Sequence, residues 1–288
     1  DVIVAFMHST YVPVAFAALG LRIPLIVSEH TDAMHYKGRY TQKIFRQIAD
    51  RFANLRTVPS ESARRSFLEA DGRNSVVVSN PIVKQTRMPN PVPDATDPVI
   101  TSVGVMRPEK DHSVLLDAFA RVADGFPDWR LRIVGDGPLR GALVAQVARL
   151  GLAARVEMPG FTRDVGAAYA KARFVVLPSR YESFGMVAAE ALAAGRAVLS
   201  FDDCAGIAEI VESGTNGLLV TGRPDREARV AALADGLRRM MGDPDLCDRL
   251  RRAGPDGVAR FGLAAVLDRW EDIFCQATGR PRQTRLER

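Results

Sequence analysis

Short apolar runs and longer amphipathic segments alternate along almost the whole chain. The apolar runs have the composition of buried strands, and the segments between them have the 3.6-residue period of helices. The predicted strands are 2–6, 24–28, 55–58, 75–79, 99–105, 129–134, 156–158, 174–177, 197–201 and 217–220. The predicted helices are 12–19, 37–50, 61–69, 113–122, 139–150, 165–171, 185–194, 207–211, 226–241, 244–261 and 263–277. This alternation predicts an α/β fold in which helices cover parallel sheets.

One proline-rich stretch divides the chain. Residues 80–98 hold five prolines and show no apolar period, which is typical of a linker. We therefore predict an N-terminal domain at 1–83, an interdomain linker at 84–98 and a C-terminal domain at 99–262. A helix and basic tail at 263–288 are expected to pack back toward the N-terminal domain. Because the chain begins without Met and inside a predicted strand, we expect the N-terminal domain to be incomplete.

The composition is that of a globular protein with a core, at 47% hydrophobic and 25% charged residues. A net charge of +5 suits an anionic ligand or an acidic membrane surface, and it is equally compatible with a solvated basic surface. Arginines gather at 280–288, as a frayed end or as a weak contact with anionic lipid. We expect no nucleic-acid partner.

The cysteines Cys204, Cys247 and Cys275 are far apart and lack metal-ligand spacing, which indicates a reducing compartment and no zinc site. No apolar run reaches membrane-spanning length, and we expect no signal peptide. We expect a cytoplasmic protein, with a peripheral position at the inner face of the plasma membrane as the alternative.

The segment from Ser179 to Gly195 carries the strongest chemical signal. Glu182 follows an apolar strand, whereas Glu190 lies inside a helix that is otherwise Ala, Val, Leu and Met. A carboxylate in so apolar a helix needs a partner or a site opening, because burying it alone is costly. Gly185 stands near the helix start, where free N–H groups can hold an anion. The segment therefore offers a phosphate cradle and two acceptors for hydroxyl groups.

A second group of residues follows the strand at 99–105. Gly104, Arg107 and Lys110 lie at the carboxyl end of that strand, where sheets of this kind bind ligands. The two cations could neutralise a diphosphate, or they could be solvated loop residues. The glycines at 135 and 137 favour a structural turn over a dinucleotide fingerprint, since the third glycine is missing.

Histidines provide a weaker signal. His30 follows a strand and could donate to a sugar or phosphate group, although a single such His is more often structural. His8 is a weaker candidate, and His35 and His112 are interpreted as loop residues. No His or carboxylate cluster accompanies the two glutamates, and the adjacent Asp202 and Asp203 point apart, so we predict no metal site.

In this order, the segments resemble the family 4 glycosyltransferases, which are retaining enzymes with the GT-B fold of two Rossmann-like domains. The resemblance rests on S-x-x-E-x-F-G-x-x-x-x-E-A-x-A-x-G at 179–195, preceded by V-G-x-x-x-P-E-K at 103–110, V-G-D-G-P-L at 134–139 and V-x-x-x-G-F at 156–161, and followed by N-G-L-L-V at 216–220. It is strong from residue 99 to 220 and looser before residue 80. It implies an acceptor-side N-terminal domain and a C-terminal domain that binds the nucleotide sugar, facing each other across a cleft.

The resemblance also implies roles for single residues. Glu182 would contact hydroxyls of the donor sugar, and Glu190 would take the ribose hydroxyls. Lys110 matches the phosphate-binding lysine of the family, and His30 falls close to the reacting sugar. The implied donor-binding segment also includes Ser183, Phe184, Gly185 and Met186, whose backbone N–H groups would face the diphosphate.

One departure concerns the residue after Gly104, where the family usually has Arg. This chain has Val105 there and Arg107 two positions later. An i to i+2 shift on a strand keeps the same face, so we expect Arg107 to supply the missing charge. The glycine-rich N-terminal loop of the family is also absent from this sequence.

Together these observations predict a hexosyltransferase that needs no metal and no cofactor beyond its donor substrate. The donor would be a nucleoside-diphosphate sugar, with UDP favoured over GDP, and the acceptor a saccharide or lipid-linked precursor of a surface polysaccharide or glycolipid. A sugar-nucleotide epimerase or glycosyl phosphorylase of the same fold is an alternative. A third is an inactive homologue that keeps the nucleotide pocket, which Val105 favours.

Overall fold

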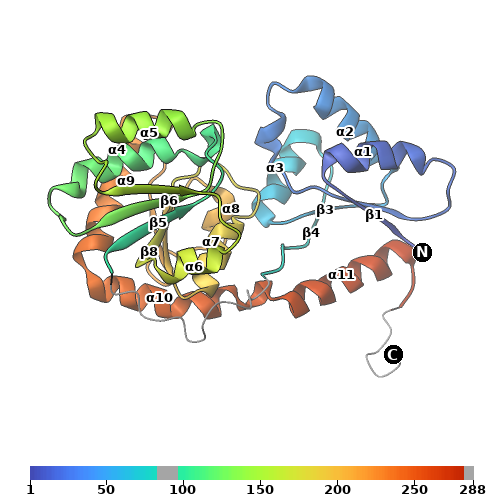
Figure 1. The fold of residues 1–288 in the computed structure, drawn as a ribbon. Helices are drawn as coiled ribbons and strands as arrows, with labels where there is room; N and C mark the ends of the chain where they lie inside the picture. The colour runs from blue at the N-terminus through green and yellow to red at the C-terminus, as the bar shows by residue number, and fades with distance from the viewer. Residues whose placement is uncertain (83–96, 282–288) are drawn as a thin grey trace. The chain divides into compact units, whose positions relative to one another are not determined.

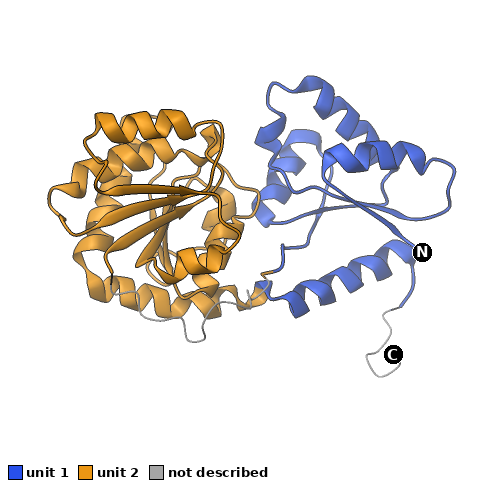
Figure 2. Ribbon diagram, viewed as in Figure 1, with its two compact units in different colours: residues 1–81, 261–288 blue, residues 82–260 orange. Residues whose placement is uncertain are grey.

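The computed structural model describes residues 1–82 and 97–281 and shows two compact units (Figure 2). Unit 1 comprises residues 1–81 together with the segment from residue 261 onward, and unit 2 comprises residues 82–260. Each unit has its own parallel sheet (Figure 1), which confirms the predicted α/β class. The predicted linker lies outside the described residues except for its last two positions, 97 and 98.

The sheet of unit 1 has the strand order β1-β2-β3-β4, and all its pairs are parallel. Its strands are β1 (Ile3–Phe6), β2 (Leu25–Ser28), β3 (Leu55–Val58) and β4 (Val76–Val77). The helices are α1 (His8–Ala17), the 3₁₀ helix η1 (Ala33–Tyr36), α2 (Tyr40–Phe52), α3 (Glu61–Asp71) and α11 (Leu263–Thr278).

Successive strand residues of unit 1 bury themselves on opposite faces of the sheet, as the pleat requires. Leu25 and Val27 of β2 pack with residues of α1 and α2. Ile26, between them, packs instead with Val266 and Ile273 of α11. The C-terminal helix therefore covers the second face of this sheet (Figure 1).

Unit 2 has a sheet of six parallel strands in the order β10-β9-β8-β5-β6-β7. The strands are β5 (Val99–Val103), β6 (Arg130–Val134), β7 (Val156–Gly160), β8 (Phe174–Leu177), β9 (Ala197–Phe201) and β10 (Gly217–Val220). The helices are η2 (Pro108–Lys110), α4 (His112–Ala123), α5 (Arg140–Arg149), α6 (Val165–Ala170), α7 (Met186–Ala193), α8 (Ala205–Ala208), α9 (Arg226–Gly242), α10 (Pro244–Val258) and η3 (Ala259–Phe261).

The strand order of unit 2 determines where a ligand can bind. The chain enters the middle of the sheet at β5, adds β6 and β7 on one side, and then crosses to add β8, β9 and β10 on the other. This is the doubly wound order, and its switch point lies between β5 and β8. The loops after these two strands diverge, so a crevice is expected at their carboxyl ends. A large apolar core, which includes residues of α4 and α9, supports the sheet.

The largest differences from the predicted elements have local causes. Helix α1 begins at His8 instead of residue 12, because Met7, with φ of 64°, turns the chain directly from β1 into the helix. Helix α2 begins at Tyr40 instead of residue 37, because Gly38 takes a left-handed φ of 78° and separates it from η1. The turn at η1 was not predicted.

Candidate donor-binding site

Lys110 and Glu182 meet at the switch point of unit 2. Lys110 ends η2 after β5, and Glu182 lies in the loop after β8. Lys110 Nζ donates to Glu182 Oε1, and the side chains are 23% and 20% exposed. Ser179 Oγ donates to the same Oε1 at 2.9 Å. Both residues were predicted to bind the donor, but their mutual contact was not. A partly exposed pair of this kind can exchange its internal bond for a ligand phosphate or hydroxyl.

The segment Ser183–Met186 forms the turn that leads into α7. Gly185 caps the helix with φ of 84°, a left-handed conformation that strains other residues. Phe184 is buried, at 3% exposure. A Cβ on Gly206, in α8, would lie 2.2 Å from the Glu182 carbonyl oxygen, so α8 and this loop pack backbone to backbone. The first amides of a helix lack partners within it, so the start of α7 offers donors to an anion.

Glu190 lies in the second turn of α7 and makes its polar contact with Tyr169, not with the Lys110–Glu182 pair. Tyr169 Oη donates to Glu190 Oε2 at 2.9 Å. Burial raises the pKa of Glu190, and the hydrogen bond from Tyr169 opposes that rise. Arg196 Nε donates to the Tyr169 carbonyl oxygen at 2.8 Å and holds this end of α6. The carboxylate in the apolar helix therefore has the partner that its burial requires.

The loop after β5 places Arg107 at the surface. Strand β5 ends at Val103, so the argument that Val105 and Arg107 share a strand face was wrong. Both side chains are nevertheless exposed, on either side of Met106, which is fully buried. Whether Arg107 supplies the missing charge stays a prediction.

Gly104 lies beside the lysine of the ion pair, since a Cβ there would be 3.8 Å from Lys110 Cδ. The turn after β6 presses against the same loop. A Cβ on Gly135 would lie 2.0 Å from the Gly104 carbonyl oxygen, and Met106 N donates to the Asp136 carbonyl oxygen at 2.9 Å. These contacts agree with a structural role for the two-glycine turn.

His112 was predicted to lie in a loop, and this was wrong. It is the first residue of α4 and is 3% exposed. Burial, together with the nearby charge of Lys110, lowers its pKa to about 4. His35 also lies in a helix, η1, and its Nε2 is 2.8 Å from Arg39 Nη1. The sequence predicted a loop at His112 because this residue directly follows the charged segment Glu109–Asp111. Asp111, with a left-handed φ of 47°, ends that loop, so the helix begins at the next residue.

His30 belongs to unit 1, where it follows β2 and is half-buried. Its Nε2 is 3.0 Å from Ser28 Oγ, which in turn accepts a hydrogen bond from Thr57 Oγ1 at 2.8 Å. Burial lowers the pKa of His30, which keeps the imidazole neutral at neutral pH. Its predicted place near the reacting sugar stays a prediction.

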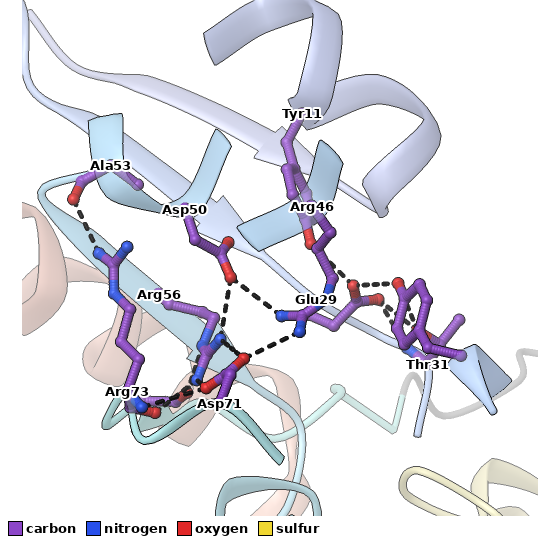
Figure 3. A network of polar contacts seen from close by, with 11 residues as sticks. Tyr11, Glu29, Thr31, Arg46, Asp50, Ala53, Arg56, Asp71 and Arg73 are labelled. Atoms are coloured by element: carbon purple, nitrogen blue, oxygen red, sulfur yellow. Dashed lines mark hydrogen bonds and ion pairs between the residues drawn. The ribbon is translucent and has the colours of Figure 1, made fainter. Parts of the chain in front are cut away.

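The residue before His30 anchors this loop. Glu29 is fully buried and accepts hydrogen bonds from Tyr11 Oη at 2.9 Å and Thr31 Oγ1 at 2.6 Å (Figure 3). It also accepts a hydrogen bond from Tyr36 Oη at 2.6 Å. Each donor is a neutral hydroxyl group, and the converging hydrogen bonds satisfy the buried carboxyl group of Glu29.

Three residues of the site were missed from the sequence: Ser179, Tyr169 and Arg229. Ser179 stands three residues before Glu182 in the S-x-x-E motif, so its position could have suggested the hydrogen bond. Tyr169 and Arg229 reach the site from α6 and α9, and nothing in their local sequence indicates it.

Within residues 1–82 and 97–281, no three His, Cys, Asp or Glu side chains gather in a way that could hold a metal ion. In the same ranges no helix has the length and apolarity to cross a membrane. Asp202 and Asp203 have separate partners, the Gly222 amide and Arg229 respectively.

The two parallel-sheet units define a GT-B protein, and solved structures share the fold. HepE of Anabaena in complex with UDP and glucose matches with a TM-score of 0.82 at 24% identity, over 94% of this chain and 77% of that one. Sucrose-phosphate synthase of Thermosynechococcus elongatus matches with a TM-score of 0.79 at 21% identity, over 96% and 74%. The predicted GT-B class of two Rossmann-like domains is confirmed.

The model of the family "Glycosyl transferases group 1" matches residues 83–256, and the chain belongs to this family. The phosphatidyl-myo-inositol mannosyltransferase of Mycobacterium tuberculosis is 32% identical over 97% of this chain and 75% of its own length. An exopolysaccharide phosphotransferase of Streptomyces coelicolor is 33% identical over 67% of this chain. The chain covers only 21% of that relative and 45% of the alpha-D-kanosaminyltransferase of Streptomyces kanamyceticus.

Proposed function

We propose that this protein transfers a hexosyl group from a nucleoside-diphosphate sugar to an acceptor hydroxyl during synthesis of a surface polysaccharide or glycolipid. The Lys110–Glu182 pair at the switch point of unit 2 carries the proposal. Lys110 supplies a cation for the diphosphate, and Glu182 supplies acceptors for sugar hydroxyls. Membership of the glycosyl transferases group 1 family supports the same class of reaction.

In the proposed reaction the bond between the anomeric carbon and the diphosphate oxygen breaks, and its electron pair leaves with the nucleoside diphosphate. Lys110, Arg107 and the first amides of α7 stabilise the negative charge that develops there. Glu182 orients the sugar while the acceptor oxygen bonds to the same face of the anomeric carbon and its proton passes to the departing diphosphate. His30 of unit 1 is proposed separately as a catalytic residue. The configuration at the anomeric carbon is retained, and no metal or cofactor takes part.

We propose a UDP-sugar as the first choice of donor and a GDP-sugar as the second. Support comes from the HepE complex with UDP-glucose and from the pneumococcal O-GlcNAc transferase GtfA in complex with UDP and GlcNAc. Glu190 would accept the two ribose hydroxyls, which UDP and GDP share. Calorimetric titration with UDP, GDP and their sugars tests the donor directly.

The Lys110→Met variant tests whether the lysine of the Lys110–Glu182 pair binds the diphosphate. A charge-assisted hydrogen bond contributes about 1.5–3 kcal/mol, so nucleoside-diphosphate affinity should fall about 10- to 100-fold. Lys171→Met removes an exposed lysine of the same unit and should leave the affinity unchanged. Equal affinity in wild type and Lys110→Met would reject the assignment.

Product analysis separates the proposed reaction from its alternatives. A transferase forms a new glycoside only when an acceptor is present, and NMR of the product shows whether the anomeric configuration is retained. An epimerase changes the donor without an acceptor, and a phosphorylase needs inorganic phosphate. An inactive homologue binds the nucleotide and gives no product in any of these mixtures.

We also propose that unit 1 contacts an anionic membrane that carries the acceptor. The predicted tail contact lies mostly outside the described residues. Exposed apolar side chains of α2, Tyr40, Ile44 and Phe45, are close in sequence to the exposed Lys37 and the half-buried Lys43. Apolar insertion next to basic residues favours anionic bilayers. Co-sedimentation should occur with phosphatidylglycerol vesicles, weaken with salt and weaken further in the Ile44→Ser/Lys43→Gln double variant. Binding to neutral vesicles alone would contradict it.

A further inference from the structure

Arg229 of α9 is a buried cation behind the switch point, with a side chain that is 2% exposed. Its guanidinium lies 3.8 Å from the ring centroid of Phe201, the last residue of β9. Nη1 donates to Asp203 Oδ2 at 2.6 Å, and Nη2 donates to the Ser179 carbonyl oxygen at 3.5 Å. Nε lies 3.9 Å from Asp111 Oδ2. One side chain thus contacts the loops after β5, β8 and β9.

Two of these loops contain Lys110 and Glu182, the ion pair of the proposed site. Asp111 directly follows Lys110, and it is 8% exposed with a left-handed φ of 47° that other contacts must hold in place. Ser179 donates its hydroxyl hydrogen to Glu182. A shift of Arg229 would therefore change the separation of the lysine from the glutamate.

The third loop acts on Glu182 through its backbone. It contains Asp203, the partner of Arg229 at 2.6 Å, and leads into α8, where Gly206 approaches the Glu182 carbonyl too closely for any side chain. Displacement of Asp203 would therefore press on the turn at the start of α7.

We infer that Arg229 is a positioning residue of the donor site. It fixes the spacing of the three loops, so that Lys110 and Glu182 meet the diphosphate and the sugar of the same donor. The inference rests on the proposed function. The planar guanidinium can serve several partners at once, whereas an ammonium group of Lys cannot match that geometry.

Arg180 offers a weaker version of the same link. Its Nε lies 2.8 Å from Asp111 Oδ2, and its amide donates to the Glu109 carbonyl oxygen at 2.8 Å. Its side chain is 41% exposed, however, and solvent screens such pairs. It also does not reach Asp203 in the contacts described. Arg180→Gln should therefore affect donor binding less than a change at Arg229.

The test compares Arg229→Lys with a matched control, Arg155→Lys. Arg155 also lies over a phenylalanine ring, Phe119 at 5.7 Å, and donates to the Trp129 carbonyl oxygen at 2.7 Å, but it precedes β7 at the opposite end of the sheet. Both variants should lower Tm. Only Arg229→Lys should weaken UDP or GDP binding, by about tenfold, because only it misplaces the binding groups.

Amide hydrogen exchange provides a second readout that needs no ligand. Exchange at 104–111 and 179–185 should quicken in Arg229→Lys and stay at the wild-type rate in Arg155→Lys. Unchanged affinity and exchange in Arg229→Lys, or equal losses of affinity in both variants, would overturn the inference. If wild type binds no nucleoside diphosphate, the proposed function fails, and exchange at the two loops alone decides whether Arg229 positions them.

Discussion

Each unit contains a network of buried arginine and carboxylate side chains, and the two networks differ in their exposure to solvent. In unit 1, Arg46 and Arg56 share Asp50 and Asp71 at 2.8–2.9 Å, and no side chain of the four is more than 5% exposed. Figure 3 shows this group beside Glu29. Its two cations and two anions balance, and it is closed to solvent.

The network of unit 2 is open. Arg229 is as deeply buried as the arginines of unit 1, but its partner Asp203 is 38% exposed. Two of the loops that Arg229 contacts contain Lys110 and Glu182, whose side chains are 23% and 20% exposed. The charges therefore continue from the interior to the crevice at the switch point.

The comparison teaches that buried charge alone does not identify a site. In unit 1 the arginines link two helices to a strand, and they stack on aromatic rings, with Arg46 4.9 Å and Arg56 5.2 Å from the centroid of Phe67. In unit 2 the partners of the arginine stand at the carboxyl ends of strands, where doubly wound sheets bind ligands. Position in the fold and partial exposure distinguish the candidate site from the scaffold.

Asp71→Asn should break the closed network with the largest effect. The change leaves two buried guanidinium groups with one carboxylate, and removal of one partner from a buried ion-pair network costs about 3–5 kcal/mol. Urea unfolding should show this loss, while nucleoside-diphosphate affinity of the folded protein should stay near that of wild type.

Glu61→Gln is the matched control, because the Glu61–Arg64 pair of α3 has the same chemistry at 46% and 28% exposure. It should leave the melting temperature almost unchanged. If Asp71→Asn lowers the unfolding free energy no more than Glu61→Gln does, the network of unit 1 is not a stabilising scaffold and the contrast with unit 2 fails.

Acid should destabilise unit 2 through His112, which directly follows the Lys110–Asp111 segment of the open network. Its pKa falls from the ordinary 6.5 to about 4 in the fold, so the folded state holds the imidazole neutral and binds its proton less readily than the unfolded chain. That stability is fully present above pH 6.5 and is lost as the pH falls from 6.5 to about 4, by about 3 kcal/mol.

Urea unfolding of wild type and His112→Leu at several pH values checks this prediction. The variant should lose less unfolding free energy than wild type between pH 6.5 and 4, since it lacks the group that must become charged. Parallel losses in the two proteins would show that other groups account for the acid sensitivity.

The sequence predicted the fold well because helices and strands of an α/β protein differ in period and length. Strands β3, β8, β9 and β10 have the predicted bounds. The positions of the candidate residues Lys110 and Glu182 after strands were also predictable, since both follow apolar runs in the chain. The α2 start was missed because Gly38 interrupts an otherwise helical pattern.

Partners from distant elements could not be predicted. Tyr169 lies 21 residues before Glu190, and Arg229 lies 26 residues after Asp203. Tyr169 stands in a short helix of small apolar residues, and Arg229 in a helix that carries several other arginines. Only packing in space selects them, so no local pattern distinguishes them from their neighbours.

Tyr169→Phe should give the smallest effect and the most specific one. The change removes one hydrogen bond, at a cost of about 1 kcal/mol in unfolding free energy. Because that bond opposes the rise that burial causes in the pKa of Glu190, its loss should raise this pKa further. Protonated Glu190 is a poorer acceptor for ribose hydroxyls, so UDP affinity should begin to fall at a higher pH than in wild type.

Tyr36→Phe provides the matched comparison in unit 1. It removes a similar hydrogen bond, 2.6 Å from Tyr36 Oη to the buried Glu29 of unit 1, and should cost a similar unfolding free energy. Calorimetry from about pH 5 to 8 should then show a displaced affinity profile for Tyr169→Phe alone. Of the two tyrosines, Tyr169 is the one bonded to Glu190, which is proposed to bind the ribose and whose pKa is raised by burial. If both variants keep the wild-type profile, Glu190 does not bind the ribose. If both displace it, the two networks are coupled and the division between scaffold and site is wrong.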